Sequence, residues 1–313
     1  MDSDAKIFVA GHKGLVGSAI VRHLKRMGYT NILTVDRKKC DLTNQAEVID
    51  WFTINKPQYV FDAAARVGGI YANDTYSGEF IHQNLCIQTN LIHASYIYGV
   101  KKFLFMGSVC IYPKFAETPV KEESLLTGHL EPTNEAYAIA KIAGIKMCEA
   151  YYKQYGFKCV SIMPSNLYGP NDNFNENNGH VIPAMIQKMV SAKNNEVTFW
   201  GDGSPYREFM YADDMADACI FLMNSEKTGK AELINAGSGE DVSIKDLSAL
   251  VAKTVGFTGK ISWDTSRPNG TPKRPLDFSK IKALGWKPKY SLEEGLTLTY
   301  KWYKENGNSR KSN

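Results

Sequence analysis

The sequence lacks the features of a membrane or secreted protein. None of its apolar runs approaches the ~20 residues that a membrane-spanning helix needs. Its first residues, Met1-Asp2-Ser3-Asp4, are acidic where a secretory leader would carry positive charge. Internal repeats and low-complexity tracts are also absent. We therefore expect a cytoplasmic protein without a membrane anchor.

Metal-binding and disulfide patterns are missing as well. No two cysteines form a C-x-x-C pair or follow zinc-ligand spacing. The six cysteines are Cys40, Cys86, Cys110, Cys148, Cys159 and Cys219. Thiols stay reduced in a cytoplasm, and most free cysteines are small core side chains. We expect neither a metal site nor a disulfide framework.

The chain has no strong excess of charge. It carries 37 Lys and Arg against 33 Asp and Glu, a net charge of +4, which demands no nucleic acid or other acidic partner. The one basic cluster, Arg37-Lys38-Lys39, is short enough to be a solvated turn. With 313 residues, 43% of them hydrophobic and 22% charged, the composition is that of a globular protein with a sizeable core.

Short apolar runs alternate with helical patterns over the first half of the chain. Strands are expected at 6–10, 32–35, 59–63, 102–106 and 159–163, and helices at 16–27, 46–55, 80–98 and 136–155. Such alternation predicts an α/β fold whose parallel sheet is covered on both faces. Ligands of these sheets lie beyond the carboxyl ends of the strands. One crevice should therefore be lined by Gly11, Asp36, Ala64, Ser108 and Pro164.

The pattern loosens after Gly169. A polar loop over 170–175 comes first, since its opening proline discourages a regular element. Helices are then expected at 181–192, at 243–255 with Ser243 as N-cap, and at 292–306. Met185 and Met189 should belong to a core.

A glycine-rich turn joins the first strand to the first helix. Its glycines allow a tight turn, close approach to a pyrophosphate, and packing of helix on strand. The helix N-terminus adds free N–H groups and a positive dipole that favour phosphate. The residues are Gly11, His12, Lys13, Gly14, Leu15, Val16 and Gly17. Because strand and helix flank this string, it predicts a dinucleotide site rather than a plain turn.

Two residues at the end of the second strand favour different cofactors. Asp36 favours NAD, because a carboxylate accepts a hydrogen bond from the ribose 2′-hydroxyl. Arg37 favours NADP, because a guanidinium meets the 2′-phosphate. Lys13 and Lys38 add positive charge nearby, so we interpret the site as one for NADP(H).

Tyr137 and Lys141 lie four residues apart, on one face of an expected helix. An ammonium beside a phenol stabilises the phenolate, so we expect Lys141 to lower the pKa of Tyr137 and make it a proton donor and acceptor near neutrality. Ser108, at the end of a strand, can hydrogen-bond a substrate carbonyl beside Tyr137.

Together with the glycine-rich turn, Ser108, Tyr137 and Lys141 resemble the short-chain dehydrogenase/reductase superfamily, and the G-x-x-G-x-x-G spacing resembles its extended branch. Within that branch the chain resembles the GDP-L-fucose synthase family from Lys6 to about Asn306. The strings that carry this resemblance are Ala65-Arg66-Val67-Gly68-Gly69-Ile70, Cys110-Ile111-Tyr112-Pro113, Glu131-Pro132-Thr133-Asn134-Glu135, Asn166-Leu167-Tyr168-Gly169-Pro170 and His180-Val181-Ile182-Pro183-Ala184.

The resemblance implies an enzyme that converts GDP-4-dehydro-6-deoxy-D-mannose to GDP-L-fucose with NADPH. Epimerisation at C3 and C5 would precede reduction of the C4 ketone. Cys110 and His180 would serve the epimerisations, since a thiol and an imidazole both exchange protons near neutrality. Ser108, Tyr137 and Lys141 would serve the reduction. Which of Cys110 and His180 is the base and which the acid does not follow from the sequence.

The resemblance also implies a fold, further contacts and a partner. The fold is a Rossmann-type doubly wound parallel sheet with a smaller α/β C-terminal substrate domain, divided into 1–169 plus roughly 209–240 for NADP, and roughly 170–208 plus 241–313 for the nucleotide sugar. Further cofactor contacts are Met106, Gly107, Lys141, Asn166, Leu167 and His180. The GDP-sugar would contact Lys188, Trp200, Arg207 and Asn269. The helices 80–98 and 136–155 would pair two copies into a homodimer.

The chain departs from the family pattern at two positions: Asn269 stands for an expected aspartate and Val109 for a frequent serine. Simpler interpretations also remain, with Cys110 as a core thiol, His180 in a solvated loop and Trp200 as core packing. Two other functions stay open. One is an NAD-dependent UDP-sugar 4-epimerase, which Asp36 would suit, and the other is a non-catalytic dinucleotide-binding scaffold.

Overall fold

The computed structural model describes residues 1–175, 179–267, 269 and 272–307. Within these residues, six parallel strands form one large sheet in the order β2-β1-β3-β4-β5-β9. The strands are β1 (Ile7–Ala10), β2 (Ile32–Leu33), β3 (Tyr59–Asp62), β4 (Lys102–Met106), β5 (Cys159–Pro164) and β9 (Lys230–Ala236). Nearly every residue of β1, β3, β4 and β5 is buried, which explains their unbroken apolar runs.

The order of the strands reverses beside β1. The chain goes from β1 outward to β2, then returns to the other side of β1 to form β3. The carboxyl ends of β1 and β3 therefore diverge at a topological switch point, where α/β sheets bind their ligands. The register pairs Ala10 with Asp62, so Gly11 and Ala63 follow directly at this point.

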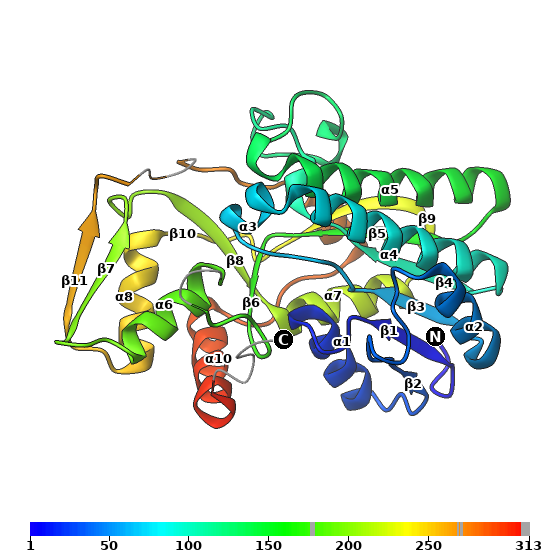
Figure 1. Cartoon of the computed structure of the whole chain (residues 1–313), viewed down its shortest axis with the longest axis horizontal. Helices are drawn as coiled ribbons and strands as arrows, with labels where there is room; N and C mark the ends of the chain where they lie inside the picture. Colours follow the sequence, from blue (N-terminus) through cyan, green and yellow to red (C-terminus); the bar gives the residue numbers. More distant parts are fainter. Residues whose placement is uncertain (176–178, 268, 270–271, 308–313) are drawn as a thin grey trace.

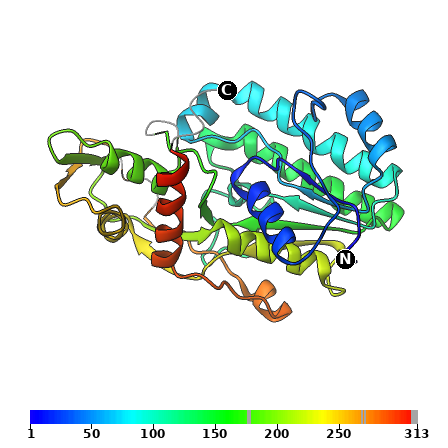
Figure 2. The same cartoon turned by 90° about the horizontal axis from the view of Figure 1, so that it is seen from below.

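Helices cover both faces of the large sheet (Figures 1 and 2). One face carries α1 (Leu15–Arg26) and α7 (Ala212–Asn224), which pack on each other. The other face carries α2 (Gln45–Asn55), α4 (Ser77–Ile97) and α5 (Glu135–Tyr155). Each layer has its own apolar core, with Ile20 and Ile220 in the first and Leu91 and Ile145 in the second. The predicted doubly wound α/β fold is confirmed.

A smaller part of the molecule lies beside the carboxyl ends of these strands (Figure 1). A mixed sheet of order β10-β8-β6 combines β6 (Asn166–Tyr168), β8 (Tyr206–Tyr211) and β10 (Asp241–Ser243). A parallel ribbon pairs β7 (Glu196–Trp200) with β11 (Lys260–Asp264). Around them stand α6 (Val181–Val190), α8 (Ile244–Val255) and α10 (Leu292–Asn306). A third core, which includes Met185 and Met189 as expected, holds this part together.

The chain passes between the two parts more than once. After β6, α6, β7 and β8 it returns through α7 and β9 to the large sheet, then leaves again for β10. Short helices α3 (Ile70–Thr75) and α9 (Ser279–Leu284) and the 3-10 turns Val109–Ile111, Glu122–Ser124 and Pro132–Asn134 complete the described elements. None of the described helices is long and apolar enough to cross a membrane.

Most of the elements expected in the first half are present, with small shifts at their ends. The second strand stops at Leu33 rather than Val35, because this edge strand pairs only with Ile7 and Phe8. Helix α4 begins at Ser77, three residues early, and α6 ends at Val190, two residues early. Ser243 caps α8 as expected, accepting from the Asp246 N–H. The sequence patterns missed β6 to β11 in the second half.

Candidate active site

The glycine-rich turn lies at the switch point and is built for close backbone approach. Gly11 has a φ of +74°, and a Cβ there would lie 2.5 Å from the Ala63 carbonyl oxygen and 2.8 Å from the Ala64 nitrogen. A Cβ on Gly17 would lie 2.2 Å from the Gly11 carbonyl oxygen. Gly14 is the N-cap of α1 and makes no side-chain cap bond, so the first N–H groups of this helix face the turn. A diphosphate fits this cradle.

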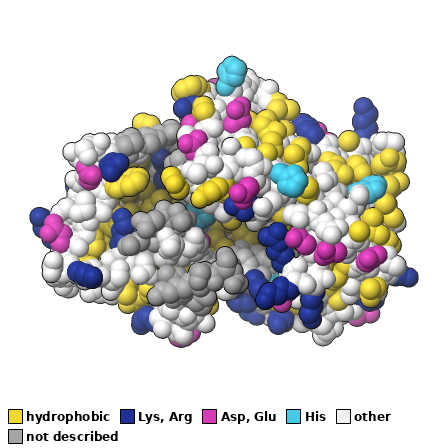
Figure 3. Space-filling model, viewed as in Figure 1, with side chains coloured by type: hydrophobic (Ala, Val, Ile, Leu, Met, Phe, Trp, Pro, Cys, Tyr) yellow, Lys and Arg dark blue, Asp and Glu magenta, His cyan; other side chains and the backbone are white. Residues whose placement is uncertain are grey.

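Two basic side chains of the turn cover the carboxylate after β2. The Lys13 Nζ lies 2.5 Å from Asp36 Oδ1, and His12 Nε2 lies 3.4 Å from the same oxygen. The hydrogen bond with Lys13 holds the pKa of Asp36 below its usual value. Arg37 pairs with Asp41 at 3.0 Å and is largely exposed. Figure 3 shows Lys and Arg side chains gathered over α1 in this region.

The predicted reduction residues meet where β4 ends. Ser108 caps the short turn Val109–Ile111, and its Oγ lies 3.5 Å from the Cys110 N–H that it accepts. The Ser108 hydroxyl also faces the Cys110 thiol and the Tyr137 phenol, and it lowers the pKa of each. Lys141 Nζ donates to the Met106 carbonyl at 2.8 Å and lies 5.9 Å from the centre of the Tyr137 ring. The structure therefore brings Ser108, Cys110, Tyr137 and Lys141 together.

The pKa of Tyr137 does not move as expected. Burial raises it well above its ordinary value, the charge of Cys110 adds to this, and the Ser108 hydroxyl opposes it. Burial of Lys141 lowers the pKa of its ammonium, and its hydrogen bond goes to a backbone carbonyl instead of the phenol. The predicted lowering by Lys141 is wrong for this structure, in which Tyr137 holds its proton and is a donor.

Cys110 lies beside Ser108 and Tyr137. Burial raises the pKa of its thiol to about 11, while Ser108, Lys141 and Arg274 oppose this rise. Arg274, which the sequence patterns did not point out, donates through Nη2 to the Tyr112 and Pro113 carbonyls at 3.0 and 2.6 Å. It fixes the segment that follows Cys110. A thiol next to a serine, a tyrosine and two cations has more polar neighbours than a core cysteine.

Asp62 is a second residue that the sequence patterns missed. It ends β3, is 1% exposed, and accepts from the Ala64 N–H at 3.2 Å. Burial raises the pKa of this carboxyl to about 6, and Lys141 opposes the rise. An acidic residue closing an otherwise apolar strand, beside the crevice, was the available signal.

His180 comes from the smaller part, at the start of α6. Its Nδ1 lies 3.7 Å from Oδ1 of Asp172, a buried carboxylate in the loop after β6. The Asp172 carboxylate raises the pKa of His180, and burial opposes this rise. The imidazole is about half exposed, at 53%, so it remains open to an incoming molecule.

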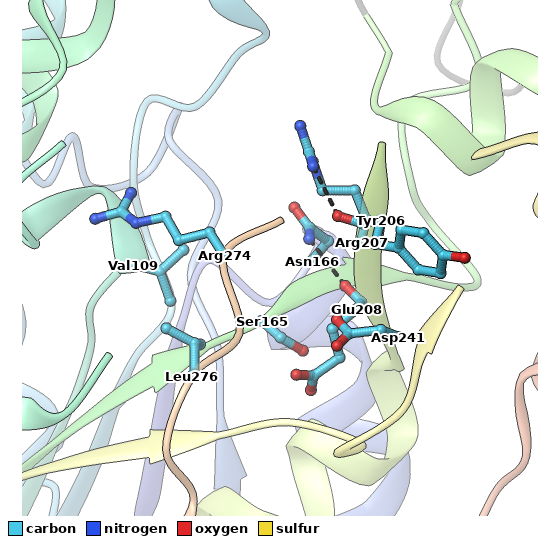
Figure 4. A pocket seen from close by; sticks show the side chains of 9 residues that line it. All are labelled: Val109, Ser165, Asn166, Tyr206, Arg207, Glu208, Asp241, Arg274 and Leu276. Atoms are coloured by element: carbon cyan, nitrogen blue, oxygen red, sulfur yellow. Dashed lines mark hydrogen bonds between the residues drawn. The ribbon is translucent and has the colours of Figure 1, made fainter. Parts of the chain in front are cut away.

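A small cavity separates the two parts of the molecule beside Val109 (Figure 4). It is lined by Val109, Ser165, Asn166, Tyr206, Arg207, Glu208, Asp241, Arg274 and Leu276. Arg207 on β8 and Arg274 on the facing segment stand on opposite sides of it (Figure 4). Asn166 holds β6 to β8 by donating to the Glu208 carbonyl at 2.8 Å. At about 50 Å³ the cavity is far below the ~300–1,000 Å³ of a ligand site, so it could hold only part of a ligand.

The other predicted sugar contacts gather at the end of β7. Trp200 is 66% exposed, because Val197 and Phe199 take the inward positions of this strand, so it is not core packing. Lys188 Nζ lies 5.8 Å from the centre of the Phe199 ring. Asn269 Oδ1 accepts from the Asp202 N–H at 2.8 Å, so its side chain holds the turn after Trp200.

The remaining predicted cofactor residues lie along the carboxyl edge of the large sheet. Gly107 follows β4, and a Cβ there would lie 1.9 Å from the Met163 side chain. Pro164 ends β5, and Asn166 and Leu167 follow on β6. In the part of the chain that the structure describes, no group of three or more His, Cys, Asp or Glu is arranged to hold a metal.

Comparison with known proteins decides the family. The model of the NAD dependent epimerase/dehydratase family matches residues 7–237. The chain belongs to this family. GDP-L-fucose synthase 1 of Arabidopsis thaliana is 56% identical over 308 residues, 97% of this chain and 95% of that protein. GDP-L-fucose synthase of Escherichia coli (strain K12) is 46% identical over 97% of this chain and 98% of its own length.

A solved structure agrees with these sequences. The GDP-L-fucose synthetase from Naegleria fowleri bound to NADP superimposes with a TM-score of 0.92 at 29% identity, covering 100% of this chain and 96% of that one. The resemblance to the GDP-L-fucose synthase family is thereby confirmed.

Proposed function

We propose that this chain is a GDP-L-fucose synthase, which converts GDP-4-dehydro-6-deoxy-D-mannose to GDP-L-fucose in two steps with NADPH. The observation that carries this proposal is the placement of Cys110 beside Ser108, whose Oγ accepts from the Cys110 N–H at 3.5 Å and which also faces Tyr137. A plain reductase needs no thiol at that point. A thiol at this position has a role if a C–H group next to the ketone must lose and regain its proton.

Epimerisation uses the acidity that the C4 ketone gives to C3 and C5. At each centre one group removes the proton, the electron pair passes into the ketone, and a second group returns a proton to the opposite face. Cys110 and His180 are proposed for these two roles. They come from different parts of the molecule, as two groups acting on opposite faces of one sugar would.

Reduction uses the other side chains of the same group. NADPH, when bound, supplies hydride to C4. Tyr137 keeps its proton because burial raises its pKa, and gives it to the sugar oxygen as negative charge develops there. The Ser108 hydroxyl orients the carbonyl, and Lys141 offsets the charge left on Tyr137.

NADP(H) is the proposed cofactor because the Asp36 charge is compensated. A bare carboxylate would repel a 2′-phosphate, but Lys13 and His12 both face Asp36. Arg37 lies next in sequence and is exposed enough to reach a phosphate. The relative with NADP bound supports this choice.

The smaller part of the molecule is proposed to hold the GDP-sugar. Arg207 would fork onto the diphosphate from the cavity wall, while exposed Trp200, with Lys188 and Asn269 beside it, would meet the remainder of the nucleotide. On this proposal 1–169 with roughly 209–240 binds the cofactor, and roughly 170–208 with 241–313 binds the sugar. Residues 176–178, 268, 270–271 and 308–313 of the sugar-binding ranges lie outside the described residues.

We further propose a homodimer formed by α4 and α5, which pack side by side on one face of the large sheet. Ile97, Ile139 and Tyr155 on these helices are each at least 42% exposed, and a second copy would cover these apolar side chains. Free cysteines throughout fit a reducing, cytoplasmic setting.

The test incubates the protein with GDP-4-dehydro-6-deoxy-D-mannose and either NADPH or NADH. GDP-L-fucose should form with oxidation of NADPH, and more slowly with NADH. Absence of GDP-L-fucose with both cofactors would refute the proposal. Interconversion of UDP-glucose and UDP-galactose without net cofactor consumption would point to the UDP-sugar 4-epimerase, and tight cofactor binding without any turnover to a scaffold.

A further inference from the structure

Asp172 is a buried carboxylate that the proposed reaction has not used. It is 5% exposed, and its Oδ1 accepts from the Asn173 N–H at 2.7 Å. The same oxygen lies 3.7 Å from His180 Nδ1. Its Oδ2 is buried and has no hydrogen-bond partner among the described residues. The carboxylate can therefore accept a further hydrogen bond, and the His180 imidazole is the side chain recorded as its ion-pair partner.

The loop that carries Asp172 is tied to the cofactor helix. The Asp172 N–H donates to the Gly169 carbonyl at 3.2 Å. Asn171 has a φ of +66° and donates through Nδ2 to Ser18 Oγ on α1 at 3.1 Å. Asp172 is therefore held relative to α1, the helix that begins the dinucleotide site, while His180 begins α6 in the other part.

We propose that Asp172 is a positioning residue for His180: its carboxylate faces Nδ1 and leaves Nε2 as the atom that exchanges a proton with the sugar. The proposal rests on the role assigned to His180 above. A distance of 3.7 Å is longer than a formed hydrogen bond, and such bonds shorten when the substrate is in place. Hydrogen bonding to a carboxylate selects the tautomer of an imidazole through the nitrogen that it occupies.

The proton balance follows from this arrangement. If His180 returns a proton to carbon, Nε2–H breaks, the C–H bond forms, and the neutral ring keeps its proton on Nδ1 beside Asp172. If His180 removes the proton, Nε2 gains it and Asp172 stabilises the resulting imidazolium. In both directions Nδ1 stays protonated, and exchange with water resets Nε2.

No competing charge acts on this imidazole within the described residues. The pKa of His180 is raised by the Asp172 carboxylate, and burial opposes this rise. Lys188 lies on α6 itself. The elements packed against α6 carry further charged side chains, none of which is among the causes of the raised pKa of His180: Glu196 on β7, Lys245, Asp246 and Lys253 on α8, and Glu293, Glu294, Lys301, Lys304 and Glu305 on α10. Because the ring is half exposed, solvent weakens the effect of Asp172 without removing it.

The test follows His180 directly by NMR in the full-length protein with ¹³C- and ¹⁵N-labelled histidine. The chain has six histidines, so the His180 signal is assigned by its loss in His180→Gln. In Asp172→Asn the His180 titration should move to lower pH. The control Asp214→Asn also neutralises a buried carboxylate that anchors a loop, through the Lys289 and Tyr290 N–H groups, and should leave His180 unchanged.

A second measurement follows exchange of the C3 and C5 protons of the keto-sugar in D₂O without NADPH. The limb of the pH profile that His180 sets should move to lower pH in Asp172→Asn, and the rate should fall about tenfold. Losing the proton donor itself is expected to cost ~10²–10⁴-fold. The limb that moves, alkaline or acidic, also tells whether His180 is the acid or the base.

The outcomes separate this inference from the proposed function. If the wild-type protein exchanges no sugar protons, the proposed function fails, while the NMR titration still tests the Asp172–His180 pair. An unchanged His180 titration in folded Asp172→Asn would overturn the inference. If that variant does not fold, ¹⁵N shifts of the neutral wild-type ring decide: a proton on Nδ1 supports the pairing, and a proton on Nε2 contradicts it.

Discussion

The two parts of the molecule differ in how their residues face a ligand. In the large sheet the candidate cofactor cradle is made of backbone, because Gly11, Gly14 and Gly17 leave no room for side chains. In the smaller part the candidate contacts are side chains on short strands, with Trp200 at the end of β7 and Arg207 within β8. Backbone recognition suits a cofactor shared by many enzymes, whereas side chains can be exchanged to suit one sugar.

The proposed chemistry lies across the boundary between these two parts. Ser108, Cys110, Tyr137 and Lys141 belong to the large sheet and its helix α5, and His180 belongs to α6. With these proposed roles, ketone reduction uses side chains of the large part alone, whereas epimerisation needs side chains of both parts. Each prediction below can break or sharpen that contrast.

The largest effect is expected at Tyr137. Tyr137→Phe removes the proton donor of the reduction but keeps the ring, so NADPH oxidation should fall by ~10²–10⁴-fold. Exchange of the C3 and C5 protons in D₂O should continue, because Cys110 and His180 are untouched. Cys110→Ser is the matched control with the reverse effect, losing exchange while keeping cofactor binding. Equal loss of NADPH oxidation and proton exchange in both variants would contradict the separate roles proposed for Tyr137 and Cys110.

The same contrast explains what the sequence could predict. Strands β1, β3, β4 and β5 are buried on both faces, so their apolar runs were visible, and Lys102–Met106 was predicted to the residue. The glycine-rich turn could be predicted from the spacing of its glycines. Ser108 could be predicted because it comes soon after a buried strand, and Tyr137 and Lys141 because their spacing puts them on one face of a helix.

The smaller part was harder to predict for physical reasons. Strands β6 and β10 have only three residues each, too few to show a period of two. Strand β11 pairs with β7 across more than 60 residues, and no local pattern signals such a pairing. Likewise Asp172 lies outside any helix or strand, so neither the burial of its carboxylate nor its position near His180 could be predicted from its neighbours in the sequence.

The next prediction compares two neighbours on β7. Phe199 is 7% exposed and packs in the core of the smaller part, so Phe199→Ala should lower the free energy of unfolding by about 3–5 kcal/mol. Trp200→Ala should change it by no more than about 0.5 kcal/mol, since that ring is 66% exposed. Urea unfolding measures both. A large loss of stability in Trp200→Ala would make Trp200 structural and weaken the contrast between the two parts.

A third prediction concerns the buried carboxyl of Asp62. Burial raises its pKa to about 6, above the ~3.9 expected in the unfolded chain. The native state therefore binds more protons between these values, and stability should fall by up to about 2–3 kcal/mol as pH rises through this window. Asp62→Asn should flatten this dependence in urea unfolding between pH 4.5 and 7. Asp50→Asn, on the exposed face of α2, is the control and should keep the slope.

The smallest effect is expected at Arg207 and tests the smaller part directly. Arg207→Ala should raise the KM for the GDP-sugar about tenfold, the loss of a charge-assisted hydrogen bond of ~1.5 kcal/mol, and should leave the KM for NADPH unchanged. Arg207→Lys should recover only part of this loss, since an ammonium keeps the charge but not the fork. Arg267→Ala removes an exposed guanidinium near Trp200 and serves as the control for charge alone. A rise in the KM for NADPH instead would mean that Arg207 contacts the cofactor. The smaller part would then bind cofactor as well as sugar, and the contrast between the two parts would be weaker.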